Sequence, residues 1–154
     1  MHPDKHPAST PDDLDDEREA RDAPPALAGM VVRVRTPVYP TEDEAAVRRA
    51  VAGVLPRVVL ERTGDQLQGA AQGPVALARL RRRLREQRIR DAARAYFVRC
   101  AKGGDLRFHV NKQSATMRVV SFATDGSPLG DIEVSVEGAE PEQVIDWVCE
   151  TFSP

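Results

Sequence analysis

The sequence predicts an α+β fold with a mainly antiparallel sheet and helices packed on one side of it. Several short segments alternate strictly between apolar and polar residues, whereas buried parallel strands would give continuous apolar runs. Between these segments the apolar residues recur at helical spacing. The predicted element order is β-α-β-β-α-α-β-β-β-α.

The first strand is predicted from the alternation of valine and arginine over residues 30–35. Thr41, with Glu44 three residues later, matches a capping box, and apolar residues at helical spacing follow it. We therefore expect the first helix over residues 41–55, ending before Pro56.

A hairpin and a helical stretch occupy the middle of the chain. Two short apolar runs on either side of a Gly-Asp turn predict two strands within residues 58–70. Apolar residues at helical spacing then follow over residues 74–102, but their stripe jumps by five residues near the middle. The jump breaks the helical period, so we expect two consecutive helices or one kinked helix.

Three strands and a helix are predicted in the last third of the chain. Residues 106–111 alternate between apolar and polar side chains, and a second strand is expected over residues 116–122. After a turn at residues 125–128, residues 131–137 alternate again. Pro141 opens an amphipathic final helix.

Residues 1–28 differ from the rest of the chain in composition. They hold eight acidic and three basic residues, five of the prolines and almost no large apolar side chain. Such a segment buries too little surface to offset its ordering entropy, so we expect a disordered acidic leader before a single domain over residues 29–154. The leader could simply aid solubility, or it could inhibit function by covering the basic middle of the chain.

Composition excludes several functional classes. No apolar run approaches the length of a membrane span, and the N-terminus resembles no secretory signal, so the expected compartment is the cytoplasm. Cys100 and Cys149 are isolated and no metal-ligand spacing occurs, so we expect no metal and no cofactor. His109 is the only histidine inside the predicted domain, and it is the one candidate for a small nuclease-type enzyme.

Positive charge is concentrated in residues 79–118, which hold thirteen Lys or Arg residues and three acids. A leucine stripe in this stretch predicts that Arg79 and Arg82 point away from the core, where planar guanidinium groups could contact consecutive phosphates. The adjacent strand ends add further basic side chains. We therefore expect non-catalytic RNA binding through Arg79, Arg82, Arg85, Arg88, Arg90, Arg107, Lys112 and Arg118.

Other interpretations of the same charge pattern stay open. The arginine helix could be a solvated surface, with Glu86 paired to Arg82, or it could bind an acidic protein partner. That partner could be the acidic leader itself or a second copy of the chain. Because Phe108 is expected to point inward, the sheet should offer little base stacking, and we expect recognition of RNA shape and backbone.

The sequence also resembles a known family. The stretches RTPVYPTEDEAAVRRAV at 35–51, LREQRIRDAARAYF at 84–97, LRFHVNKQSA at 106–115, SPLGDIEV at 127–134 and IDWV at 145–148 resemble, in order and spacing, a family of small uncharacterised archaeal proteins described as RNA-binding. The resemblance implies a fold like that of the large-subunit ribosomal protein that binds 5S rRNA, and a link to ribosomal or RNA-processing machinery. It implies RNA contacts at Arg85, Arg88, Arg90, Lys112 and Arg118. The acidic leader and the dense arginines of residues 79–83 depart from the family.

Overall fold

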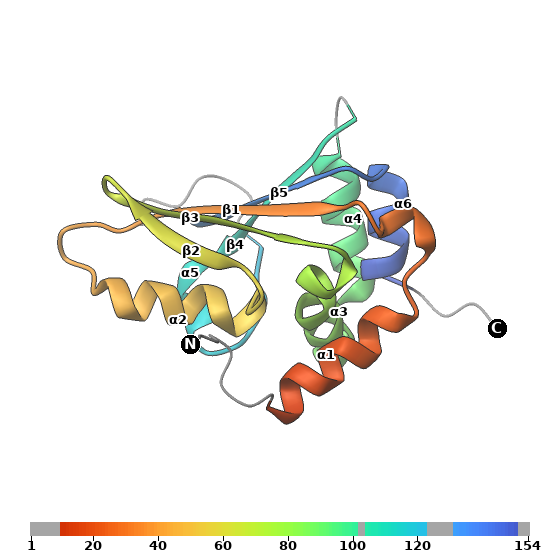
Figure 1. Cartoon of the computed structure of the whole chain (residues 1–154), viewed down its shortest axis with the longest axis horizontal. Helices are drawn as coiled ribbons and strands as arrows, with labels where there is room; N and C mark the ends of the chain where they lie inside the picture. Colours follow the sequence, from red (N-terminus) through yellow and green to blue (C-terminus); the bar gives the residue numbers. More distant parts are fainter. Residues whose placement is uncertain (1–9, 102–103, 123–130, 151–154) are drawn as a thin grey trace, which may run out of the picture.

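A five-stranded antiparallel sheet organises the chain, with helices on one of its faces (Figure 1). The structure is a computed structural model, and it describes residues 10–101, 104–122 and 131–150. The strands are β1 (Val31–Pro37), β2 (Val59–Thr63), β3 (Gln66–Gln72), β4 (Leu106–Asn111) and β5 (Asp131–Glu137). Their order across the sheet is β2-β3-β1-β5-β4, and every neighbouring pair is antiparallel. The predicted fold class is confirmed.

The helices form two groups beneath the sheet. They are α1 (Pro11–Arg21), α2 (Glu44–Val54), α3 (Ala78–Glu86), α4 (Arg90–Cys100), α5 (Lys112–Thr116) and α6 (Pro141–Val148), with 3-10 turns η1 (Pro25–Leu27) and η2 (Pro74–Leu77). Helices α2 and α5 lie under one half of the sheet, and α3, α4 and α6 lie under the other half (Figure 1). Helix α1 packs on the outer side of α3. None of the helices in the described part of the chain has the length and apolar character of a bilayer-spanning segment.

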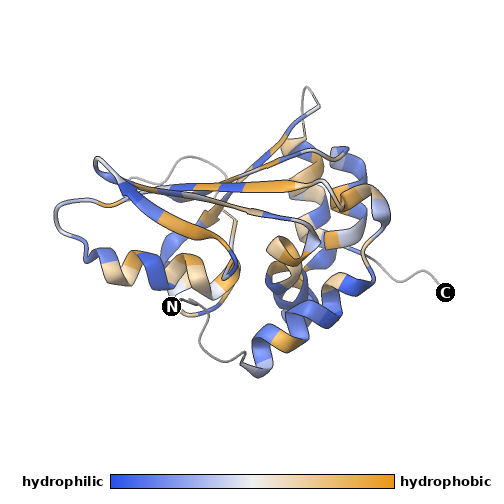
Figure 2. Ribbon diagram, in the orientation of Figure 1, coloured by the Kyte–Doolittle hydropathy of each residue, from blue (hydrophilic) through white to orange (hydrophobic). Residues whose placement is uncertain are grey.

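The core lies between the sheet and the helices, where the apolar sides of both meet (Figure 2). Phe108 of β4 and Phe97 of α4 are each 1% exposed, and their ring centroids are 4.6 Å apart in an edge-to-face arrangement. Leu80 and Leu84 of α3 are also buried, as the predicted leucine stripe requires. This packing fixes the direction in which the arginines of α3 point.

Most of the predicted elements are confirmed. The hairpin of β2 and β3 turns at Gly64, which has a φ of 63°, and two consecutive helices, α3 and α4, follow it. The capping box at Thr41 is wrong, because the N-cap of α2 lies two residues later, where the side chain of Asp43 accepts a hydrogen bond from the N–H of Ala45. Glu44 instead forms ion pairs with arginines.

The strand predicted over residues 116–122 is also wrong. Asn111 ends β4, and its side chain accepts a hydrogen bond from the N–H of Ser114, which starts α5 where alternation predicts extended chain. What remains of the strand is an isolated bridge between Val110 and Phe122. The turn predicted at residues 125–128 lies outside the described residues.

Residues 10–28 of the acidic segment, which were expected to be disordered, contain α1 and η1. Thr10 caps α1 in a capping box with Asp13, and Pro11 occupies the first turn. Leu27, which follows in η1, is completely buried in the core. Composition missed this helix because its stabilising partners are arginines far along the chain. The domain boundary at residue 29 stays a prediction.

Candidate nucleic-acid interface

The outward side of α3 carries three arginines, Arg79, Arg82 and Arg85, which we call the arginine face. They point away from the core as predicted, but α1 lies over them. Arg79 is 7% exposed, and its Nε lies 3.1 and 3.0 Å from the two carboxylate oxygens of Asp16. Arg82 donates to the same carboxylate at 2.8 Å, and Asp16 is completely buried. The two arginines expected to contact solvent therefore share a buried carboxylate.

Glu19 makes a second set of contacts between α1 and α3. Arg85 donates to both carboxylate oxygens of Glu19, at 2.6 and 2.9 Å. Arg81 also pairs with Glu19, and it reaches Glu150 and the carbonyl of Trp147 at the end of α6. α1 and α6 are thus joined through one guanidinium group.

These ion pairs change the pKa values of the groups involved. Burial alone would raise the pKa of Glu19, but the hydrogen bonds and charges of Arg85 and Arg81 outweigh it and lower that pKa. The hydrogen bond to Glu19 likewise raises the pKa of Arg85. Burial would lower the pKa of Arg82, but hydrogen bonds to Asp16 and Asp12 raise it. The arginine face is fully charged and neutralised by α1.

A different group of arginines lies where α2, α3 and α5 meet. Arg83 of α3 donates from Nε to the carbonyl of Gly53 in α2, at 3.4 Å. Gly53 allows α2 to approach α5 closely, since a Cβ there would lie 2.5 Å from the carbonyl oxygen of Ala115 and 3.7 Å from the Cα of Arg118. Arg49 and Arg118 line a hollow of 390 Å³ beside Gly53, and Asp12 and Asp13 of α1 line it with them.

Helices α3 and α5 both end in a Schellman motif. At the end of α3, the N–H of Ile89 donates to the carbonyl of Leu84 and that of Arg88 to Arg85. At the end of α5, the N–H groups of Val119 and Arg118 bond to Ser114 and Ala115 in the same way.

The left-handed position of each Schellman motif is occupied by arginine. Arg88 has a φ of 60° and Arg118 a φ of 61°, and within the described residues they are the only non-glycine residues with positive φ. Glycine is the usual residue at this position, because a Cβ in left-handed backbone costs about 1–2 kcal/mol. Arginine therefore stands at both positions despite a conformational cost.

The two helix ends are joined by Gln87. Its side-chain amide donates to the carbonyl of Val120 at 3.0 Å and accepts from the N–H of Val120 at 2.8 Å. Arg88 directly follows Gln87, and Arg118 precedes Val120 by two residues. We call the group Arg49, Arg83, Arg88 and Arg118 the arginine edge.

Positive charge exceeds negative charge at the arginine edge, where the nearby Asp12 and Asp13 are paired to Arg82 and Arg79 of the arginine face. Among the described residues, Arg49, Arg88 and Arg118 are exposed and have no acid within ion-pair distance, while Arg83 has Glu86 at 3.8 Å. Burial, and after it the charge of Arg79, lowers the pKa of Arg83. This excess of positive charge favours an anionic ligand.

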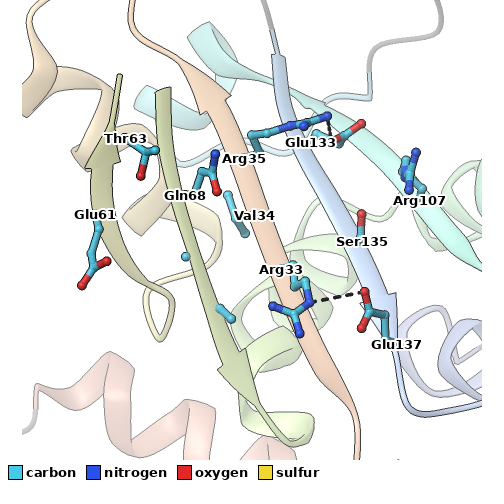
Figure 3. A pocket seen from close by; sticks show the side chains of 12 residues that line it. Arg33, Val34, Arg35, Glu61, Thr63, Gln68, Arg107, Glu133, Ser135 and Glu137 are labelled. Atoms are coloured by element: carbon cyan, nitrogen blue, oxygen red, sulfur yellow. Dashed lines mark hydrogen bonds and ion pairs between the residues drawn. The ribbon is translucent and has the colours of Figure 1, made fainter. Parts of the chain in front are cut away.

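The uncovered face of the sheet is hollowed over 460 Å³, but its charges are balanced (Figure 3). Arg33 pairs with Glu137 at 3.3 Å, and Arg35 pairs with Glu133 at 2.8 Å. Arg107 is exposed on this face. In the described strands no Phe, Tyr or Trp side chain lies there, which agrees with the inward position of Phe108. The sheet face offers little base stacking.

The remaining predicted RNA-binding residues are dispersed. Lys112 is buried, and its Nζ donates to Glu42 and to the carbonyl of Pro37. Arg90, at the start of α4, is half-buried. Burial raises the pKa of the Cys149 thiol near the end of α6, and the positive charge of Arg90 acts to lower it. The structure thus brings two predicted residues, Arg88 and Arg118, to the arginine edge.

Sequence reasoning left Arg49 and Arg83 out of the predicted site. Arg49 lies on α2, far in sequence from the basic segment, and only the tertiary contact at Gly53 brings it beside Arg118. Arg83 belongs to the predicted arginine run, but its separation from the arginine face depends on which helix covers each side of α3. Neither feature leaves a local pattern in the sequence.

The candidate catalytic residue has a simple environment. The Nε2 of His109 lies 3.5 Å from a carboxylate oxygen of Glu133, which also pairs with Arg35, and the histidine side chain is partly exposed. Within the described ranges, no cluster of His, Cys, Asp or Glu side chains is arranged to hold a metal. The expectation of a non-catalytic protein stays a prediction.

Comparison with known proteins connects this geometry to a family. Residues 31–137 match the family model described as RNA binding, so α1 lies outside the matched residues. A UPF0201 protein of Methanopyrus kandleri is 42% identical over 136 residues, covering 78% of this chain and 86% of the relative. A UPF0201 protein of Sulfurisphaera tokodaii is 36% identical over 121 residues, covering 75% and 83%.

Solved structures of this family share the fold. A UPF0201 protein from Methanococcus jannaschii has a TM-score of 0.68 at 26% identity, covering 80% of this chain and 95% of that chain. An uncharacterised UPF0201 protein has a TM-score of 0.62 at 31% identity, covering 68% and 80%. The predicted resemblance to an archaeal family is confirmed, whereas the likeness to a ribosomal protein stays a prediction.

Proposed function

We propose that this chain, which belongs to the UPF0201 family, binds RNA by contacting the phosphate backbone through the arginine edge. The observation that carries the proposal is the pair of left-handed arginines, Arg88 and Arg118. Each stands where glycine would cost less, and backbone strain of this kind is concentrated at functional sites in proteins. The match of residues 31–137 to a family model described as RNA binding supports RNA as the anion.

The chemistry of the arginine edge suits phosphate. Guanidinium groups are planar and always charged, and they donate paired hydrogen bonds to phosphate oxygens. Arg49, Arg88 and Arg118 are exposed without acidic partners in the described part of the chain, so binding RNA would not require breaking an ion pair. Because no exposed aromatic platform accompanies them on the sheet, we expect contacts to backbone and shape instead of base sequence.

The proposal is tested by fluorescence-polarisation binding of the full chain to structured RNA, single-stranded RNA and duplex DNA at two salt concentrations. The Arg49→Gln/Arg118→Gln variant should bind RNA roughly thirtyfold more weakly, because two phosphate contacts are lost and each contributes about 1 kcal/mol. The matched control, Arg18→Gln/Arg99→Gln, makes the same change in net charge at exposed positions away from the edge. Equal losses in both variants would contradict a specific site, as would the absence of RNA binding at low salt.

A second candidate function is docking of an acidic protein partner. The observation that favours it is α1 itself, since an acidic helix already covers the arginine face. Such a partner, or a second copy of the chain, would compete with α1. Added RNA would displace a protein partner only if both bind the same arginines, so competition binding separates the two functions. A role beside ribosomal or RNA-processing machinery in the cytoplasm is the setting we propose for the first function.

A further inference from the structure

We infer that the arginine face of α3 is a second phosphate-binding surface, and that α1 blocks it as an intramolecular acidic competitor of RNA. The inference rests on the proposed RNA-binding function and extends it to the surface that α1 covers. It makes RNA affinity depend on whether α1 is docked. The contacts, the charge spacing and the attachment of α1 each support it.

The contacts that hold α1 on α3 are mainly ionic. The residue of α1 that is fully buried is an acid, Asp16, whereas its one large apolar residue, Leu14, is 43% exposed. Figure 2 shows α1 as hydrophilic along most of its length. A helix that packed only for stability would turn an apolar stripe toward its neighbour. The surface beneath α1 therefore selects negative charge.

α1 presents a dense line of negative charge to α3. Asp12, Asp13, Asp15, Asp16 and Glu19 each contact an arginine of α3. At a rise of ~1.5 Å per residue, these five carboxylates span about 10 Å of helix axis, or one charge per ~2.6 Å. A strand of B-form DNA carries one phosphate per ~3.4 Å along its axis, and the duplex carries one per ~1.7 Å. A nucleic acid therefore offers the same arginines a comparable density of negative charge.

The buried ion pairs also determine what can replace α1. When α1 leaves, Arg79 and Arg82 lose their acidic partner and return to water. A neutral ligand that covered them would bury two guanidinium groups unpaired, which is unfavourable. An anion avoids this penalty, because it gives both arginines a charged acceptor. Anions that reach this surface are thus the ligands that can displace α1.

The attachment of α1 allows it to leave without unfolding the domain. Leu27 is completely buried and Ala23 packs against the core, so the chain after α1 is held independently of it. Pro24 and Pro25 separate α1 from Leu27 and keep the connection short. A tethered competitor has a local concentration in the millimolar range, so even a weak ionic contact keeps α1 docked for most of the time.

The test neutralises the acids of α1 in the full-length chain. The variant Asp15→Asn/Asp16→Asn/Glu19→Gln should bind single-stranded RNA about tenfold more tightly than the wild type, because a surface covered for about nine-tenths of the time has its affinity reduced by about that factor. The matched control, Asp22→Asn/Glu140→Gln/Glu142→Gln, makes the same charge change at exposed acids that form no ion pair among the described residues. Its affinity should stay within about twofold of the wild type.

The outcomes separate this inference from the proposed function. If the wild type binds RNA through the arginine edge but the folded neutralised variant binds no more tightly, the inference fails and the proposed function stands. An equal gain in the control would also overturn the inference, since net charge alone would explain it. If no variant binds RNA, the proposed function fails, and both proposals fall with it.

A second measurement covers the case in which the triple variant does not fold. Arg81 contacts Glu19 and lies 5.0 Å from the ring centroid of Trp147, the single tryptophan of the chain. Displacement of α1 should therefore change tryptophan fluorescence when RNA is added to the wild type. In the milder Glu19→Gln variant the change should appear at several-fold lower RNA concentration. An RNA-saturated wild type with unchanged fluorescence would refute displacement of α1.

Discussion

Replacing Arg88 and Arg118 by glycine separates their binding role from any structural role. Both residues occupy the left-handed position of a Schellman motif, with φ values of 60° and 61°. Glycine takes this conformation without strain and keeps all the backbone hydrogen bonds of the motif. The two substitutions therefore remove the guanidinium groups and the strain together.

The expected effect on stability follows from three terms. Relief of left-handed strain stabilises the fold by about 1–2 kcal/mol at each site. The greater freedom of glycine in the unfolded chain offsets about 0.5–1 kcal/mol, and loss of a cation near a helix C-terminus offsets about 0.3–1 kcal/mol. The free energy of unfolding should thus change by no more than about 1 kcal/mol per site in either direction, and the melting temperature by no more than about 4 °C per site.

RNA binding, in contrast to stability, should clearly weaken. If each arginine contacts one phosphate, the Arg88→Gly/Arg118→Gly variant loses two contacts, and the slope of log K against log salt for single-stranded RNA should become shallower by about 1.4. Thermal unfolding followed by circular dichroism and polarisation binding over a salt series measure the two effects. Unchanged affinity would refute the arginine edge as the site. A melting temperature lowered by more than about 8 °C in the double variant would show that the two arginines serve the fold instead.

Three further predictions address α1 and the helix packing. Gly53→Ala should lower the free energy of unfolding by about 1–3 kcal/mol in thermal denaturation, because its Cβ would lie 2.5 Å from the carbonyl oxygen of Ala115. The pKa of Glu19 lies below its ordinary 4.5 when α1 is docked, so its ion pairs with Arg81 and Arg85 are intact above 4.5 and are lost as pH falls through the lowered pKa. Tryptophan fluorescence should report release of α1 during this acid titration, and a signal that stays constant until the whole domain unfolds would contradict it. The α1-neutralised variant should show a salt slope steeper than the wild type by about 2, since three more arginines can reach phosphates, and equal slopes would oppose it.

Local patterns were sufficient to predict most of the fold. Alternating valines and arginines predicted β1, and a five-residue jump in an apolar stripe predicted the break between α3 and α4. The errors occurred where side chains bind backbone within a few residues. Asn111 ends a strand by capping α5, and Asp43, not Thr41, caps α2. Competing capping residues of this kind look alike in the sequence.

The candidate site was less accessible to sequence reasoning, because it depends on long-range pairing. The leucine stripe correctly oriented Arg79 and Arg82 outward, but it could not indicate that an acidic helix more than sixty residues earlier covers them. Left-handed backbone at Arg88 and Arg118 is similarly invisible, since arginine normally signals ordinary helical conformation. Glycine at those positions would have revealed the two helix ends.

Two expectations depended on the same assumption. They were that the acidic leader is disordered and that the arginine helix is exposed. Each was inferred from a segment considered alone, where unpaired like charges oppose folding or face water. Together the segments neutralise one another, and Asp16 joins Arg79 and Arg82 in a site that excludes solvent. Because arginines of the edge stay exposed beside this neutralised face, α3 has one side ready for an anion and one side already occupied. RNA affinity measured on the full chain should therefore reflect the edge alone until α1 is displaced.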